Sequence, residues 1–176
     1  MRSLAPWIVG LALLGTACRQ SDSKKPESPA ETPEALVSRM NTETDTLMAR
    51  PEHQAAEVEV QHVLIGVQGG MPGVTRSPGE AEELAAEVYS RAMKGEDFDT
   101  LERNYSSDIH PGIYTMTAQR TSPQVPNTWP RQDMARAFGD VAWRLEVGQI
   151  GVARYDGAMP GDPSSPFGYH IVRRRK

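Results

Sequence analysis

The chain has 176 residues, of which 38% are hydrophobic and 24% are charged, a composition that fits one folded domain with additional polar segments. Its 19 basic and 23 acidic side chains leave a net charge of −4, which excludes a general electrostatic affinity for nucleic acid. Beyond the N-terminus there is no run of about 18 apolar residues, so the sequence predicts no second membrane span.

The first 17 residues have the order of a secretory signal peptide. Arg2 comes before the apolar run 7–14, and the small residues 15–17 lead directly to Cys18. This cysteine, the only one in the chain, resembles the acylated cysteine of a bacterial lipoprotein, although Gly15 stands where such sequences usually carry Leu. Several acyl chains on Cys18 would anchor the chain firmly, because each buried CH₂ contributes ~0.8 kcal/mol. The alternative is an ordinary cleaved signal followed by an incidental cysteine.

These features predict a protein of the cell envelope that is lipid-anchored to a membrane and faces the periplasm or another extracytoplasmic space. Arg19 follows the cysteine, at the position where an Asp is associated with inner-membrane retention in enteric bacteria. Outer-membrane sorting is therefore the favoured hypothesis, and the inner membrane stays open as the alternative.

Residues 18–55 are predicted to form the acylated cysteine and a flexible polar tether. The segment is rich in Pro and in charged residues, so it offers too little apolar surface to offset the entropy lost on ordering. A loose apolar periodicity over residues 34–48 is compatible with a short helix, but the linker interpretation is preferred.

From residue 56 to residue 176 the pattern is that of a folded domain. The stretch 58–67 is rich in β-branched residues and predicts a buried strand. Ser77, Pro78 and Glu80 form a capping box with proline at the first helical position, and apolar residues then recur with helical spacing as far as Met93. A second short helix is predicted over 98–104.

The remaining elements are a short strand at 113–117, a helix over 132–145, and two strands at 150–155 and 167–173. Strands that are mixed with helices and end in a hairpin favour the α+β class with an antiparallel sheet.

Five short sequences, in this order and spacing, resemble the parvulin-type peptidyl-prolyl cis/trans isomerases, also called PpiC-type rotamase domains. They are VQHVLI (60–65), AMKGEDF (92–98), YSSD (105–108), MARAFGDVAWRLEVGQ (134–149) and FGYHIV (167–172). The resemblance covers essentially the whole predicted domain. It implies a parvulin-like fold, with a four-stranded, mostly antiparallel sheet surrounded by about four helices.

The resemblance also implies roles for three polar residues. His62 and His170 correspond to the two central histidines of the family, which are hydrogen-bonded across adjacent strands. Asp108 lies where the family has Cys or Asp. These three are the candidate catalytic residues. Taken alone, a histidine in an apolar strand is more often a structural core residue, and a lone aspartate can simply cap a turn.

Four further residues are the candidate walls of a pocket for the substrate proline ring. Met134 and Phe138 are predicted to lie one helical turn apart and to point the same way, and Tyr114 and Phe167 complete the set. Without the family they would be assigned to the core. The sequence departs from the family at 110–115, where a Gly-Gly-Asp-Leu-Gly motif is usual, and the loop from there to Trp129 is unusually polar and Pro-rich.

The resemblance implies a peptidyl-prolyl isomerase that assists the folding of extracytoplasmic proteins, with proline-containing unfolded or extended polypeptides as partners. The chemistry is non-covalent, since only a twisted amide has to be stabilised, so neither a cofactor nor a metal is expected. The first loop, 68–76, has Arg76 as its single basic residue, which argues against phosphorylated Ser/Thr-Pro substrates. The alternative function is a tethered chaperone or peptide-binding module with little or no isomerase activity.

Overall fold

The computed structural model describes residues 31–121, 125–157 and 161–176. The predicted signal peptide 1–17, Cys18 and the first part of the predicted tether lie outside the described residues. No helix in the described part of the chain is both long enough and apolar enough to cross a membrane.

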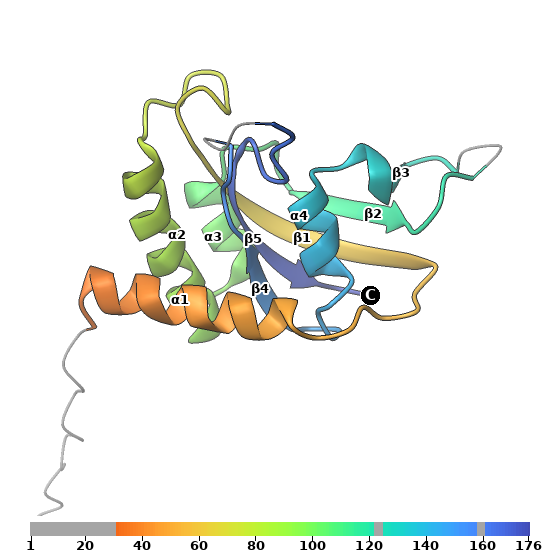
Figure 1. Cartoon of the computed structure of the whole chain (residues 1–176), viewed down its shortest axis with the longest axis horizontal. Helices are drawn as coiled ribbons and strands as arrows, with labels where there is room; N and C mark the ends of the chain where they lie inside the picture. The colour runs from red at the N-terminus through yellow and green to blue at the C-terminus, as the bar shows by residue number, and fades with distance from the viewer. Residues whose placement is uncertain (1–30, 122–124, 158–160) are drawn as a thin grey trace, which may run out of the picture. The chain divides into compact units, whose positions relative to one another are not determined.

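The domain combines helices with one five-stranded sheet (Figure 1). In chain order the elements are α1 (Pro33–Met48), β1 (Glu57–Gly66), α2 (Pro78–Met93), α3 (Phe98–Tyr105), β2 (Ile113–Thr117), β3 (Thr128–Pro130), the 3₁₀ helix η1 (Arg131–Asp133), α4 (Arg136–Ala142), β4 (Ile150–Ala153) and β5 (Gly168–Arg174). The strand order is β3-β2-β1-β5-β4, and every pair is antiparallel except β2 with β3.

This arrangement confirms the α+β class and the mostly antiparallel sheet. The expectation of four strands is wrong, because the three-residue strand β3 adds a parallel fifth one beside β2. Too short to show any periodicity, β3 ends in Pro130 and lies inside the loop that departs from the family.

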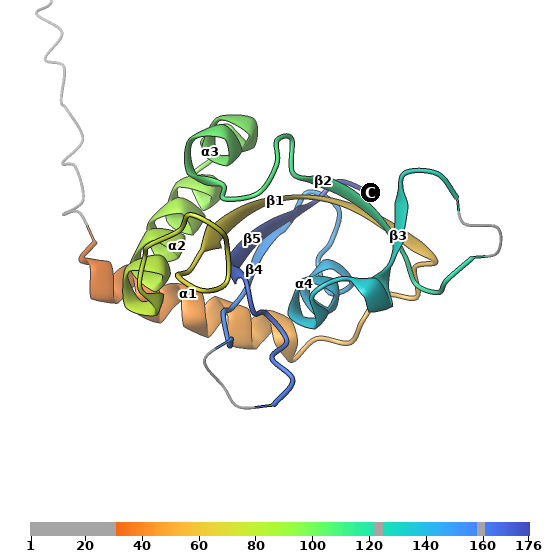
Figure 2. The same cartoon turned by 90° about the horizontal axis from the view of Figure 1, so that it is seen from above.

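The helices divide between the two faces of the sheet, as Figures 1 and 2 show. On one face α2 and α3 pack over Val63, Ile65 and Ile171. On the other face α4 packs over Val60 and Val172. Side chains alternate between faces along a strand, so His62 and His170 share the face of α4.

Residues 33–48 form a helix, so the preferred linker interpretation of this segment is wrong. Thr32 caps α1 by accepting a hydrogen bond from the Ala35 N–H, and Pro33 occupies the first helical turn. Met40 is fully buried and Leu47 is 4% exposed, one in each of the two cores. The compact unit that contains the sheet therefore covers residues 31–176 and includes α1.

The helix predicted over 132–145 is shorter and interrupted. It is represented by η1 and by the seven-residue α4, and between them Met134 has an extended backbone with φ −97° and ψ 163°. Ala135 at the N-cap has no side-chain acceptor, and the Ala137 N–H donates instead to the Ser164 carbonyl. Met134 and Phe138 are thus not related by a helical turn, although both reach the same cavity, as described next.

Candidate active site

Two histidines meet at the centre of the sheet on the face covered by α4. Antiparallel pairing places Leu64 opposite His170 and Val172 opposite His62, so the histidines are diagonal neighbours on β1 and β5. Their Nδ1 atoms lie 3.0 Å apart. Both residues are almost completely buried, with exposed fractions of 3% for His62 and 4% for His170. The predicted hydrogen bond across adjacent strands is therefore present.

Asp108 extends this pair into a network. Its Oδ2 lies 2.9 Å from His62 Nε2 and accepts from the Tyr114 hydroxyl at 2.7 Å, while its Oδ1 accepts from the Ile109 N–H at 2.8 Å. The hydrogen bond from His62 is the main reason why the pKa of Asp108 lies well below its usual range, and Tyr114 and Ile109 add to this against the opposing effect of burial. Asp108 is consequently ionised near neutral pH.

The ionised carboxylate of Asp108 determines which nitrogen of His62 carries a proton. A carboxylate only accepts, so His62 Nε2 carries a proton. Burial, followed by the nearby His62, lowers the pKa of His170 to about 3, so His170 is neutral. One of the two Nδ1 atoms carries the proton that joins the rings, and the second ring nitrogen of His170 is Nε2. That nitrogen is buried and has no hydrogen-bond partner within the described ranges.

Aromatic rings enclose the network. The Phe138 ring centroid is 5.0 Å from that of His62 and 5.3 Å from that of His170. Tyr114 stands edge-on to His62 at 5.3 Å, and burial, with the Asp108 carboxylate as a further cause, raises the pKa of its hydroxyl. Tyr114 therefore remains a hydrogen-bond donor while its ring faces the cavity.

A cavity of about 240 Å³ opens over these rings. It is lined by His62, Leu64, Met71, Asp108, Tyr114, Met134, Ala135, Phe138, Phe167 and His170. We call it the proline pocket. All seven candidate catalytic and substrate-binding residues of the described chain line it. Phe167 lies just before β5, not at its first residue.

Three lining residues were not predicted from the sequence. Leu64 follows from alternation on β1, because it shares a face with His62. Met71 is an apolar residue in an otherwise Gly- and Pro-rich loop, and that contrast was the available signal. Ala135 gives no signal, since its place depends on the break between η1 and α4.

Two glycines allow the backbone to approach the histidines closely. At Gly112 (φ 63°) a Cβ atom would lie 2.6 Å from the His62 carbonyl oxygen, and at Gly168 (φ 153°) it would collide with the Ile65 carbonyl oxygen. Any other residue at these positions would push apart the segments that set the histidine rings.

Arg76, the basic residue of the loop 68–76, binds a backbone carbonyl. Arg76 donates to the Gly66 carbonyl at 2.7 Å and belongs to a different surface cavity from the proline pocket. Its guanidinium is thus engaged with the backbone of β1.

Comparison with known proteins places this geometry in context. Residues 46–175 match the family described as the PPIC-type PPIASE domain. The chain is 28% identical over 123 residues to foldase protein PrsA 4 of Bacillus cereus, covering 69% of this chain and 32% of that protein. It is 31% identical over 124 residues to chaperone SurA of Chromohalobacter salexigens, covering 68% of this chain and 23% of that protein. The chain thus spans about a third or less of the length of these relatives.

A solved structure, peptidyl-prolyl isomerase ESS1 from Candida albicans, superposes on 79% of this chain and 74% of its own, with 18% sequence identity and a TM-score of 0.48. The α1 residues 33–45 lie before the part of the chain that matches the family.

Proposed function

Because the chain belongs to the PPIC-type (parvulin-type) PPIase domain family, we propose that it is a peptidyl-prolyl cis/trans isomerase that assists the folding of polypeptides outside the cytoplasm. The observation that carries the proposal is a single cavity in which apolar walls lie directly above a buried histidine–aspartate network. The family relatives whose names describe them as a foldase and a chaperone support a role in folding.

The reaction neither makes nor breaks a covalent bond. Rotation about an X–Pro bond meets a barrier of about 18–20 kcal/mol, and an acceleration of about 10⁴-fold needs ~5.4 kcal/mol of preferential binding of the transition state. In that state the amide is twisted and has lost its resonance, so its nitrogen gains a lone pair and its carbonyl becomes less polar. An apolar pocket that grips the proline ring favours this state over the planar ones.

The side chains divide this work. Met134, Phe138 and Phe167 contact the proline ring and keep water from the amide. The network of His62, His170 and Asp108 holds the floor of the pocket rigid and sets the local field. Tyr114 belongs to both groups, since its ring lines the pocket and its hydroxyl donates to Asp108.

A peptide assay tests the activity. The rate of cis-to-trans conversion of a proline tetrapeptide is measured with the protein and with its His62→Ala and Met134→Ala variants, alongside suppression of the aggregation of an unfolded client. An isomerase accelerates conversion and both variants lose rate. A protein that suppresses aggregation without accelerating conversion would instead be a peptide-binding chaperone.

We further infer from residues 1–18 that the protein is exported and lipid-anchored through Cys18. A labelled fatty acid supplied to expressing cells tests this inference. The wild-type protein takes up label and sediments with membranes, whereas a Cys18→Ser variant does neither. If the wild-type protein is exported but takes up no labelled fatty acid, residues 1–17 are an ordinary cleaved signal peptide and Cys18 is not acylated.

A further inference from the structure

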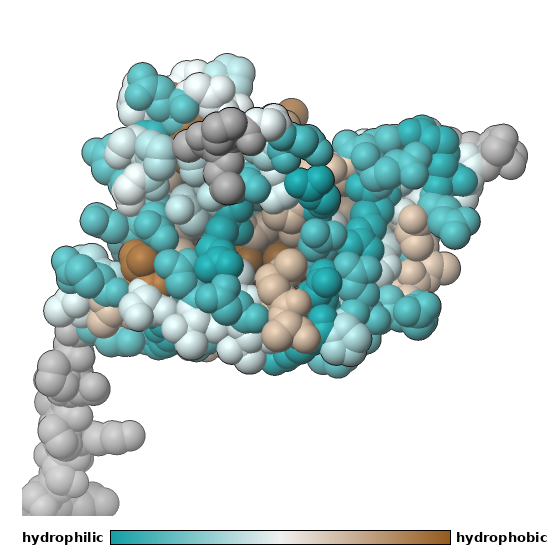
Figure 3. Space-filling view, viewed as in Figure 1, coloured by the Kyte–Doolittle hydropathy of each residue, from teal (hydrophilic) through white to brown (hydrophobic). Residues whose placement is uncertain are grey.

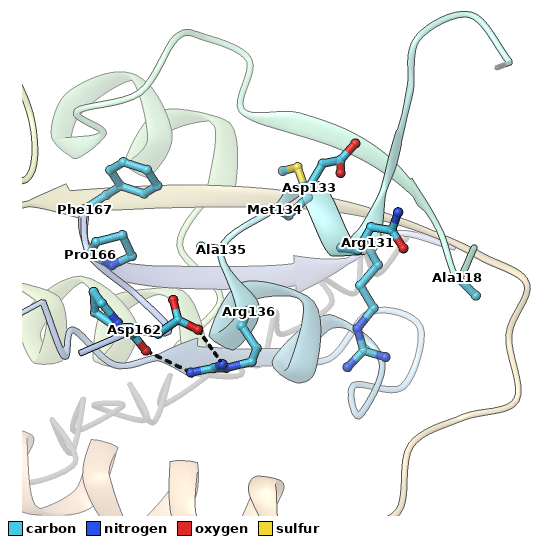
Figure 4. A pocket seen from close by; sticks show the side chains of 11 residues that line it. Ala118, Arg131, Asp133, Met134, Ala135, Arg136, Asp162, Pro166 and Phe167 are labelled. Atoms are coloured by element: carbon cyan, nitrogen blue, oxygen red, sulfur yellow. Dashed lines mark hydrogen bonds and ion pairs between the residues drawn. The ribbon is translucent and has the colours of Figure 1, made fainter. Parts of the chain in front are cut away.

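A second cavity of about 570 Å³ adjoins the proline pocket. We call it the flanking groove; its walls are the segment 131–136 on one side and Asp162, Pro163, Pro166 and Phe167 on the other (Figure 4). Met134, Ala135 and Phe167 line both cavities. A polypeptide whose proline occupies the pocket can therefore continue into the groove without leaving the surface.

The two cavities differ in chemistry. The proline pocket is walled mainly by apolar side chains, whereas the flanking groove also presents Arg131, Asp133, Arg136 and Asp162. Hydrophilic side chains predominate on the face of the molecule that Figure 3 shows. The groove is thus suited to the hydrated residues of an extended chain and not to a second apolar ring.

Of the four charged residues, Arg131 is committed within the fold. Arg131 binds Glu52 through two hydrogen bonds of 2.7 and 2.6 Å, and it also binds Asp140 at 2.6 Å. Its guanidinium lies over the Trp143 ring. Asp133 is paired with Arg120. A substrate would have to break well-packed contacts to use Arg131.

Arg136 is held differently. Its Nη1 lies 3.1 Å from Asp162 Oδ2 and its Nη2 donates to the Asp162 carbonyl at 3.1 Å, as the dashed lines in Figure 4 mark. The two side chains are 59% and 90% exposed. Such an exposed ion pair gains little over its hydrated components, so another carboxylate can replace that of Asp162. The nearby Asp156 makes no direct ion pair with Arg136 among the described residues; its oxygens accept from Ser164 and Ser165, and these hydrogen bonds, together with the charge of Arg136, lower its pKa against the effect of burial.

We propose that the flanking groove binds the client residues next to the proline, and that Arg136 there pairs with an acidic client side chain in place of Asp162. The proposal rests on the proposed isomerase function. It assigns to this protein a preference for proline segments that carry a neighbouring Asp or Glu, read from the α4 side of the pocket and not from the loop 68–76.

The test uses short peptides that contain one proline. Each peptide carries Glu, Gln or Lys at a single position, which is one of the two residues before the proline or one of the two residues after it. Conversion rates are measured by NMR exchange spectroscopy, and affinities by chemical-shift titration, with the mature protein at an ionic strength of about 0.01 M. At one position the Glu peptide is expected to exceed the Lys peptide by about twofold to fivefold in kcat/KM and in affinity. This preference disappears at about 1 M salt.

Three variants locate the effect. Arg136→Gln abolishes the preference for Glu, and Asp162→Asn increases it because the competing carboxylate is gone. Arg154→Gln is the matched control: Arg154 is also an exposed cation with one acidic partner, Asp45, but it lies in a different cavity. This variant keeps the wild-type preference.

The outcomes separate this proposal from the previous one. If the neutral peptides are isomerised but Glu and Lys peptides behave alike at every position, the groove assignment is wrong and the enzyme assignment stands. If no peptide is isomerised, the enzyme assignment fails. The affinities from the titration then decide whether the groove binds acidic client residues through Arg136. A preference for Glu that survives Arg136→Gln would also refute the role of Arg136.

Discussion

The two faces of the sheet use the same strands in different ways. On the α2 side Ile171 and its neighbours pack against Ala and Val side chains, and buried hydrophobic residues fill the space. On the α4 side the adjacent residue His170 lies under an open cavity, with a buried nitrogen that lacks a partner in the described part of the chain. The closed face fixes the register, and a slip of one residue would exchange the two sets of side chains.

Under the proposed function, alternation along a single strand separates the side chains that stabilise the fold from those that line the proline pocket. Substitutions on the closed face should cost stability alone. Those on the open face should cost activity, whether or not they also cost stability. Paired substitutions, one on each face, test this distinction.

The largest expected effect comes from the two buried phenylalanines, Phe138 on the open face and Phe98 on the closed one. Each change to Ala is expected to lower the free energy of unfolding by about 3–5 kcal/mol, measured by urea denaturation. Only Phe138→Ala is expected to lower kcat/KM as well, by about 100-fold or ~2.7 kcal/mol, because it removes a wall of the proline pocket.

Activity is compared at a temperature where circular dichroism shows both variants folded. Should either be too unstable, the Leu variants at the same positions give a smaller form of the same contrast. Equal losses of kcat/KM at the two positions would remove the distinction between the faces.

The next effect is a dependence of stability on pH. Because the pKa of His170 is lowered to about 3, the unfolded chain binds a proton below about pH 6.5 that the folded chain does not. Stability from this residue is present above pH 6.5 and is lost toward pH 3, by at most ~1.4 kcal/mol per pH unit. His170→Asn should flatten this fall between pH 6.5 and 4.5 by about 2 kcal/mol.

Ile171→Val is the matched variant on the opposite face. It is expected to lower stability by about 1 kcal/mol equally at every pH. Urea denaturation across a pH series measures both. An unchanged slope in His170→Asn would mean that His170 is not held neutral.

A smaller effect is expected from removing a carboxylate charge. Asp108→Asn should lower kcat/KM about tenfold, or ~1.4 kcal/mol, while leaving measurable activity, because the pocket walls remain and the network alone loses its charge. Asp99→Asn is the control, since Asp99 binds Gln61, which lies on the other face of β1. A tenfold loss in both variants would indicate a general effect of charge.

The smallest effect concerns α2, which covers the closed face. Ser77 caps this helix, and Ser77→Ala is expected to lower the free energy of unfolding by about 1 kcal/mol. The isomerase rate should be unchanged within error. A clear loss of rate would show that the closed face influences the pocket after all.

Much of the fold follows from local sequence signals. The capping box of α2 is present as predicted, and β1 and β2 lie within one residue of their expected positions. The sequence analysis prefers a linker over the helix α1, because the polar composition of this segment outweighs the local signals for a helix. These signals were Thr32 before Pro33, and Met40 and Leu47 spaced at seven residues on a face that becomes buried only through tertiary packing.

The site was predicted more completely than the elements that build it. All seven candidate catalytic and substrate-binding residues line the proline pocket, yet Met134 reaches it from an extended segment and not from a helix. The order of motifs supplied these residues, whereas the break before α4 depends on the Ser164 carbonyl, which lies far away in the sequence. The roles of the lining residues remain predictions until the variants are measured.

Under the proposed function, Pro130 bears on how the protein meets unfolded chains. It closes β3, the outermost strand on that side of the sheet, and it has no N–H to offer. An extended client cannot add itself there through an unbroken ladder of backbone bonds, a route by which sheet proteins aggregate with the very chains they encounter. On the β3 side, the edge of the sheet thereby discourages the addition of a client strand.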